Sequence, residues 1–320
     1  MFSVSEAQAL KQALPEIDFR QPAQPGAALE SYLQHYGLDF QSGADPKTHD
    51  VHHAMGFFMA GHRRIACQYF QPQNPVATVV LVHGYYDHVG LYGHLIRYCL
   101  HRRYAVVAFD LPGHGLSEGD AAAIDSFSEY TDALQVCLQG MGKAELARPY
   151  HGLGQSTGGS VLMDYCQTHC EPGSSALDHV VLLAPLVRPS HWARGRWLHT
   201  VARLFVSGIA REFAVNSHDE AFLRFVREKD PLQSRRLTVR WVSALKQWLR
   251  EFAARRPCLR PLIVIQGTGD TTVDWQYNLK AIARQFPSVQ ISTLEDARHH
   301  LANESQPYRE QVYALLDKYL

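Results

Sequence analysis

The pentapeptide Gly154-Gln155-Ser156-Thr157-Gly158 constrains the fold of this chain more than any other stretch. It follows a short apolar run that ends at Leu153 and opens a segment in which apolar residues have helical spacing. A serine between a strand and a helix has a strained backbone, so small residues are needed two positions before and after it. The sequence therefore predicts a nucleophile elbow that exposes Ser156, although the pattern Gly-x-Ser-x-Gly also occurs by chance in glycine-rich loops.

Strand and helix patterns alternate around this elbow. Continuous β-branched and apolar runs, which are typical of strands buried on both faces, occur at 77–82, 104–109, 150–153, 180–183, 262–265 and 289–294. Segments with helical spacing separate them at 91–101, 126–141, 159–166 and 275–286, and a last one spans 306–320. We expect an α/β fold whose mostly parallel central sheet has helices on both faces.

Two further sequence signals give local detail. Residues 53–59 and 64–70 bracket Ala60-Gly61-His62, which predicts a hairpin of two antiparallel edge strands. Ser126 and Glu129 predict a capping box at the start of the 126–141 helix.

The alternation is interrupted between residues 187 and 256, which divides the chain. We expect an N-terminal extension at 1–50, a core formed by 51–186 and 257–320, and a helical cap inserted at 187–256. Within the insertion, the apolar residues of 192–213 share one face of a predicted helix. That face could cover the site as a lid or simply be buried in the core.

Composition excludes several classes of function. Lys plus Arg and Asp plus Glu are balanced at 31 each, so no net charge attracts the chain to nucleic acid. The 18 His have no metal-ligand spacing, and no apolar run is long enough for a membrane span or a signal peptide. The six Cys do not form a disulfide framework, and Cys166 and Cys170 are expected to be buried thiols. We expect a cytoplasmic protein in a reducing compartment.

Partners for Ser156 should lie at the carboxyl ends of later strands, where the loops of a parallel sheet converge. Asp270 follows the 262–265 strand, with Asp274 as an alternative acid, and His299 and His300 share the loop after the last strand. The order serine, acid, histidine is typical of a triad built on such an elbow.

Two backbone N–H groups should stabilise an oxyanion formed next to Ser156. One is that of Thr157, directly after the nucleophile, and the other is expected from Tyr85, in the loop after the 77–82 strand. His83 is expected to brace that loop rather than to act as a second base.

Four motifs together resemble the α/β-hydrolase superfamily. They are the elbow, the segments 83–88 and 110–119, and the pair Asp270 and His299. More narrowly, they resemble its monoacylglycerol lipase and lysophospholipase branch, which is serine aminopeptidase S33-like. This resemblance implies an α/β-hydrolase fold with Ser156 as nucleophile, Asp270 as acid and His299, followed two positions later by an apolar residue, as base. It also implies that the N–H groups of Tyr85 and Thr157 form the oxyanion hole.

The chain departs from this branch at Gln155, Tyr86 and Pro112, where the branch usually has His, often has Gly and commonly has Arg. These departures leave the expected triad intact but bear on the substrate.

The sequence predicts a serine hydrolase of carboxylic esters, with a lysophospholipid or a monoacylglycerol as the leading substrate class. Trp192, Trp197 and Phe205 are expected to contact the substrate, and no metal or organic cofactor is expected. Arginines of the cap could meet a phosphate headgroup or form a solvated basic face, and the cap could touch a membrane surface transiently. The alternatives are an aminopeptidase or amidase of the same fold and a non-catalytic binding protein. The sequence does not indicate an oligomeric state.

Overall fold

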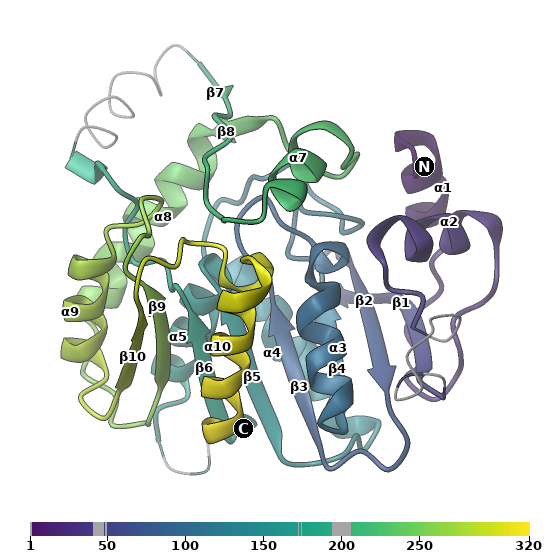
Figure 1. The fold of residues 1–320 in the computed structure, drawn as a ribbon, viewed down its shortest axis with the longest axis horizontal. Helices are drawn as coiled ribbons and strands as arrows, with labels where there is room; N and C mark the ends of the chain where they lie inside the picture. The colour runs from purple at the N-terminus through teal and green to yellow at the C-terminus, as the bar shows by residue number, and fades with distance from the viewer. Residues whose placement is uncertain (1, 41–47, 49, 172, 174, 194–205) are drawn as a thin grey trace.

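The computed structural model describes residues 2–40, 48, 50–171, 173, 175–193 and 206–320. Its central element is an eight-stranded sheet in the order β1-β2-β4-β3-β5-β6-β9-β10 (Figure 1). The strands are β1 (His52–Ala60), β2 (Arg63–Gln71), β3 (Ala77–Val82), β4 (Tyr104–Phe109), β5 (Tyr150–Gln155), β6 (His179–Leu183), β9 (Ile263–Gly267) and β10 (Gln290–Leu294). Only β1 with β2 and β2 with β4 pair antiparallel in this sheet, and its other pairs are parallel.

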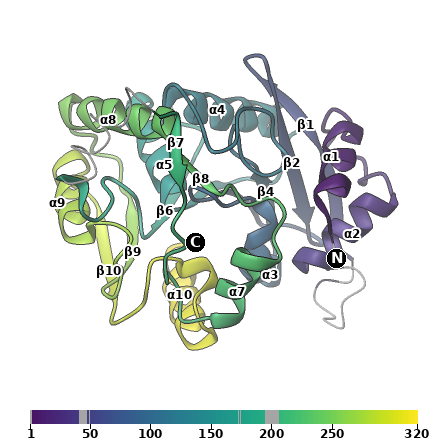
Figure 2. The same cartoon turned by 90° about the horizontal axis from the view of Figure 1, so that it is seen from above.

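Helices cover both faces of the sheet, with α3 and α10 on one face and α4 and α5 on the other (Figures 1 and 2). The described α-helices are α1 (Val4–Ala13), α2 (Ala27–Tyr36), α3 (Gly93–His101), α4 (Ser128–Lys143), α5 (Thr157–Thr168), α7 (Glu220–Glu228), α8 (Val239–Ala254), α9 (Trp275–Gln285) and α10 (Gln306–Tyr319), and the 3-10 helices are η1 (Val89–Tyr92) and η2 (Leu301–Asn303). The predicted α/β architecture is confirmed.

The core explains why the central strands are continuous apolar runs. In β3, Val80 and Val82 belong to the apolar cluster that contains buried residues of α4 and α5. Val79 and Leu81 point the other way, into the cluster with α3 and α10. Because successive side chains of a strand alternate between faces, a sheet covered on both faces needs apolar residues at every position.

The capping box predicted at Ser126 forms only in part. The Glu129 carboxylate accepts a hydrogen bond from the Ser126 N–H at 3.1 Å, as expected. The Ser126 hydroxyl instead accepts one from the Ser128 N–H at 3.2 Å, and α4 begins two residues later than predicted. The carboxylate also binds the Asp125 N–H at 2.7 Å, so it anchors the whole turn before the helix.

The N-terminal segment packs against the sheet and against residues of the 187–256 segment. α1 begins with a complete capping box between Ser3 and Glu6. α2 presents Tyr36, whose hydroxyl donates to Asp230 Oδ1 at 2.7 Å.

Residues 187–256 contribute α7, α8 and a two-stranded ribbon over the carboxyl ends of the central strands (Figure 1). The ribbon pairs β7 (Gly208–Ala210) with β8 (Arg236–Thr238). The helix predicted over 192–213 is therefore wrong at 208–210. Gly208 explains the difference, because a Cβ there would lie 2.6 Å from the Leu237 carbonyl oxygen, so the glycine permits close strand pairing. The rest of that prediction falls largely on 194–205, including Trp197 and Phe205, which lie outside the described residues.

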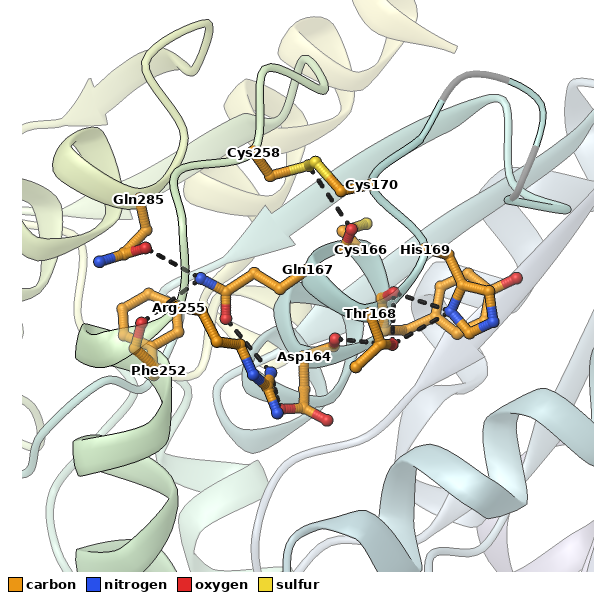
Figure 3. Close-up of a disulfide and its surroundings, with 11 residues drawn as sticks. Asp164, Cys166, Gln167, Thr168, His169, Cys170, Phe252, Arg255, Cys258 and Gln285 are labelled. Carbon is orange, nitrogen blue, oxygen red and sulfur yellow. Dashed lines mark hydrogen bonds and ion pairs between the residues drawn. A yellow bond between two sulfur atoms is a disulfide. The ribbon is translucent and has the colours of Figure 1, made fainter.

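A disulfide joins Cys170, just beyond α5, to Cys258, in the segment between α8 and β9 (Figure 3). The expectation of a free thiol is therefore wrong for Cys170, whereas Cys166 is a free and buried cysteine. α5 ends at Thr168, so Cys170 no longer follows the helical direction of Cys166. Its partner lies 88 residues along the chain, which is why spacing alone could not reveal the pair.

Within the described ranges, none of the helices has both the length and the apolar character needed to cross a membrane.

Candidate active site

Ser156 lies between β5 and α5 in the strained conformation that its neighbours predicted. Its φ is 53° and its ψ is −112°, a region that residues other than glycine rarely adopt. The flanking glycines make this turn possible, because a Cβ on Gly158 would lie 2.0 Å from the Val82 carbonyl oxygen. A Cβ on Gly154 would lie 2.6 Å from the backbone of Gly158. The turn brings the serine to the N-terminus of α5.

Three side chains from three strand ends form one hydrogen-bonded chain. His299 Nε2 lies 2.9 Å from Ser156 Oγ, and His299 Nδ1 lies 2.7 Å from Asp270 Oδ2. Because a carboxylate only accepts, His299 Nδ1 must donate, and the unprotonated Nε2 then accepts from the serine hydroxyl. This tautomer is the one that can remove the serine proton.

The Asp270 carboxylate is held by more than His299. The N–H groups of Thr272 and Val273 donate to Oδ1 at 2.8 and 3.1 Å, and Gln266 Nε2 donates to Oδ2 at 3.1 Å. Burial alone would raise the pKa of Asp270, but the neighbouring His299 and these hydrogen bonds lower it below the ordinary value. The group therefore stays ionised and fixes the imidazole.

The alternative residues lie in other contacts. Asp274 caps α9 by accepting from the Tyr277 N–H, and it forms an ion pair with Arg188 at 2.6 Å. His300 Nε2 lies 3.2 Å from Asp87 Oδ2 instead of facing Ser156. Among the described residues, only Asp270 and His299 therefore complete a chain to the serine.

The loop after β3 approaches the serine so closely that a Cβ on Gly84 would lie 3.4 Å from Ser156 Cβ. His83 fixes this loop: its Nε2 accepts from the Leu111 N–H at 2.8 Å, so its Nδ1 donates to the Gly84 carbonyl at 2.7 Å. Burial lowers the pKa of His83 to about 3, which keeps the ring neutral. His83 braces the loop as the sequence predicted.

Tyr85 and Thr157, the two predicted oxyanion donors, line the same cavity as Ser156. Within the part of the chain that the structure describes, neither backbone N–H donates a hydrogen bond. Both groups are therefore available to a ligand, and their role in stabilising an oxyanion stays a prediction.

Gln155 has a contact that sequence analysis missed. Its Nε2 donates to the His299 carbonyl at 2.9 Å, and its Oε1 accepts from the Ala302 N–H at 3.3 Å. The side chain thus ties the elbow to the histidine loop. The sequence offered only the signal that this residue departs from the family pattern.

A buried network connects the loop after β3 to the segments around it. Asp230 accepts from His88 Nε2 at 2.9 Å, from the Tyr36 hydroxyl and from Gln233 Nε2 at 2.9 Å. His88 and Asp230 are both fully buried. Since Tyr36 comes from α2 and Asp230 follows α7, three distant segments share this one carboxylate.

Ser156 and His299 open into a cavity of about 900 Å³. Most of its lining is apolar and comes from Leu186, Trp192, Ile209, Phe213, Phe222, Leu223, Val226, Leu237, Trp241, Val242 and Val273. Trp192, one of the predicted substrate contacts, is part of this lining. The described residues include no cluster of three or more His, Cys, Asp or Glu that could hold a metal ion.

Comparison with known proteins defines the class of this chain. The sequence pattern of the serine aminopeptidase S33 family matches residues 73–306. The chain therefore belongs to this family, and the predicted resemblance to α/β-hydrolases is confirmed.

The chain is similar to several lipases and to a phospholipase. It is 26% identical over 268 residues to phospholipase YtpA of Bacillus subtilis, which covers 78% of this chain and 99% of that protein. It is 32% identical over 123 residues to the human monoglyceride lipase, or 38% of this chain and 39% of that one.

Solved structures show the same fold. A monoacylglycerol lipase from Paleococcus ferrophilus superposes with a TM-score of 0.66 at 22% identity, over 79% of this chain and 97% of that one. A monoglyceride lipase from Saccharomyces cerevisiae gives a TM-score of 0.68 at 17% identity, over 82% and 94% of the two chains.

Proposed function

We propose that this protein is a serine hydrolase that cleaves carboxylic esters, and that its substrates are monoacyl lipids. The observation that carries the proposal is the hydrogen-bonded chain from Ser156 through His299 to Asp270, which opens into a large apolar cavity. Similarity to lipases and a phospholipase supports the same class of reaction.

In the proposed first step, His299 Nε2 takes the proton of the Ser156 hydroxyl while Oγ attacks the ester carbonyl carbon. The carbonyl oxygen becomes an oxyanion that accepts hydrogen bonds from the N–H groups of Tyr85 and Thr157. Each such donor lowers the barrier by about 3 kcal/mol. The imidazolium then protonates the leaving alcohol, and an acyl group remains on the serine.

Water completes the cycle by the same route. His299 takes a proton from the water, whose oxygen attacks the acyl-enzyme carbonyl, and then returns the proton to Ser156 Oγ as the carboxylic acid leaves. Asp270 keeps the Nδ1–H tautomer and stabilises the imidazolium in both steps. No cofactor is needed in this scheme, because the three side chains and two backbone groups supply base, nucleophile and electrostatic stabilisation.

The apolar lining favours an acyl chain as the buried part of the substrate. Each buried methylene contributes about 0.8 kcal/mol of transfer free energy. A cavity of about 900 Å³ is at the large end of small-molecule sites. We infer that Trp192 contacts this chain, and that a monoacylglycerol or a lysophospholipid is cleaved.

A series of p-nitrophenyl esters of increasing acyl length tests the proposal, with parent protein and Ser156→Ala compared at each length. We expect kcat/KM to rise with acyl length and the mutant to be inactive throughout. A parent enzyme that gains nothing beyond about four carbons would exclude the lipid substrates while leaving the esterase.

An aminopeptidase is the second candidate, because the family takes its name from that activity. A free substrate amine would need carboxylates near the site, and residues 187–256 contain 13 Arg but only six Asp and Glu. Of the two carboxylates among the described residues that line the cavity, Asp87 lies 3.2 Å from His300, and Glu212 is exposed. Hydrolysis of aminoacyl p-nitroanilides faster than of the esters would favour this candidate.

Absence of turnover and of fluorophosphonate labelling on folded protein would favour a binding protein.

The division into an extension at 1–50, a core and a cap at 187–256 stays a prediction, as does transient membrane contact through the cap. The cytoplasmic location also stays a prediction. The disulfide between Cys170 and Cys258 speaks against the reducing compartment on which it was based, since disulfides persist mainly in oxidising compartments.

A further inference from the structure

Arg211 is a cation in the wall of the apolar cavity that contains Ser156. Its guanidinium lies 4.0 Å from the ring centre of Tyr86 and 4.4 Å from that of Phe213. Tyr86 directly follows Tyr85, so the charge lies beside the loop that carries the proposed oxyanion donor. The Arg211 backbone is fixed as well, because its N–H donates to the Arg235 carbonyl at 2.9 Å.

The guanidinium is only partly satisfied within the protein. Nη1 donates to Gln233 Oε1 at 2.5 Å and to the Ser234 carbonyl at 3.2 Å. Over the ranges that the structure describes, no carboxylate forms an ion pair with Arg211, and its Nε and Nη2 atoms donate no hydrogen bond. Part of the fork is therefore open to a ligand.

The carboxylates near Arg211 either bind other groups or are exposed to solvent. Asp87 accepts from the Tyr92 hydroxyl at 2.7 Å and lies 3.2 Å from His300. Asp230 is held by His88 and Tyr36 in the buried network. Glu212 also lines the cavity but is exposed and forms no ion pair with Arg211 within the described chain.

Two further arginines lie near this end of the cavity. Arg227 also lines it, and the Arg235 guanidinium lies 5.8 Å from the ring centre of Phe213 on which Arg211 packs. Burial lowers the pKa of Arg211, so the surroundings disfavour its charge, but a guanidinium remains protonated in proteins. Arg211 is half-buried, and a partly desolvated cation is stabilised when an anion pairs with it.

We propose that Arg211 recognises an anionic oxygen group on the substrate, so that the preferred substrate is a monoacyl ester with a phosphate headgroup rather than a neutral glyceride. This proposal rests on the ester hydrolase proposed above. The guanidinium fork matches the geometry of phosphate oxygens, and a charge-assisted hydrogen bond of this kind is about twice as strong as a neutral one. The headgroup would lie beside the Tyr86 ring while the acyl chain occupies the apolar lining.

Two substrates that differ only in one phosphate group test this assignment. We would measure kcat/KM for 1-octanoylglycerol and 1-octanoylglycerol 3-phosphate, both as monomers in solution, so that adsorption to a lipid surface has no part. Arg211→Gln should lower the phosphate-to-glycerol ratio of kcat/KM about tenfold or more, since a hydrogen bond to a charged group is lost. Arg211→Lys, which keeps the charge without the fork, should recover part of the ratio.

Arg224→Gln is the matched control, because Arg224 is exposed on α7 and is not part of the cavity lining. We expect it to leave the ratio unchanged. If Arg211→Gln lowers kcat/KM for both substrates equally, or changes neither, Arg211 has only a structural role and the assignment is wrong. Inorganic phosphate gives a second readout: it should inhibit hydrolysis of the neutral ester competitively, and Arg211→Gln should weaken that inhibition.

The two proposals fail in different ways. No turnover of either ester by the parent protein contradicts the ester hydrolase itself. Turnover of both esters without preference for the phosphate contradicts the role of Arg211 alone. Inhibition by free phosphate without a preference for the phosphate ester would mean that the site binds inorganic phosphate and not a headgroup, which also overturns the assignment.

Discussion

Replacing Asp270 with Asn should stop the reaction through the tautomer of one histidine. The N–H groups of Thr272 and Val273 donate to Oδ1 and need an acceptor there, so the amide oxygen of the mutant must take that position. The amide NH₂ then faces His299 Nδ1, which can only accept from it. It also faces Gln266 Nε2, which loses one acceptor but keeps its hydrogen bond to the Gly267 carbonyl at 2.9 Å. The imidazole proton moves to Nε2, and His299 can no longer remove the proton of Ser156.

The loss of rate can be estimated from the free energy needed to turn the amide of the Asp270→Asn side chain into its other orientation. Turning the amide round would restore the acceptor for His299 but leave two backbone N–H groups facing a donor. Each buried and unsatisfied donor costs about 1–3 kcal/mol. Two such donors cost about 2–6 kcal/mol in total, which keeps the active tautomer rare, and the rate should fall roughly 30- to 10⁴-fold.

Steady-state hydrolysis of a p-nitrophenyl ester measures this loss, and the rate of fluorophosphonate labelling gives it independently of deacylation. Asp274→Asn is the matched control, because Asn keeps the helix cap and loses only a partly exposed ion pair with Arg188. We expect its activity to stay within about twofold of the parent. An Asp270→Asn enzyme with a tenth or more of parent activity would refute the tautomer argument. An inactive Asp274→Asn enzyme would indicate that Asp274, and not Asp270, is the acid of the triad.

Three further predictions concern stability. Gly158→Ala should abolish folding or cost more than about 3 kcal/mol in urea unfolding, because its Cβ would lie 2.0 Å from the Val82 carbonyl oxygen; near-parent stability would contradict this. His151 is buried and its pKa is lowered to about 4 by burial, so the unfolded chain binds more protons between about pH 6.5 and pH 4 and stability falls as pH falls through that range. His151→Leu should reduce the fall between pH 7 and pH 5 by about 2 kcal/mol, and an unchanged pH dependence would show that this ring does not carry it. Cys170→Ser should lower the unfolding free energy by about 2–4 kcal/mol because it removes a link to Cys258, and adding a reductant should destabilise the parent but not the mutant.

The parts of the fold that could be predicted are those in which local sequence and global burial agree. β3 and β4 have the predicted bounds, because a strand buried on both faces leaves a continuous apolar run. The elbow could be located because its glycines mark a local requirement. At Gly154 and Gly158 another part of the backbone comes so close that a Cβ would collide with it.

The parts that could not be predicted depend on contacts between distant segments. The Gly208 strand forms only because Leu237 is brought beside it. Asp230, Tyr36 and His88 are separated along the chain, and nothing in their spacing shows that they meet. Nothing in the sequence around Arg211 shows that its guanidinium lies in the cavity wall beside the rings of Tyr86 and Phe213.

The most direct test of the central claim is the site of covalent modification. After reaction with a fluorophosphonate, peptide mass spectrometry of the parent and of Ser156→Ala would locate the adduct. We predict a single adduct on Ser156, loss of labelling in the mutant, and parallel loss of ester hydrolysis. Labelling at another serine, or hydrolysis that survives in Ser156→Ala, would contradict the account.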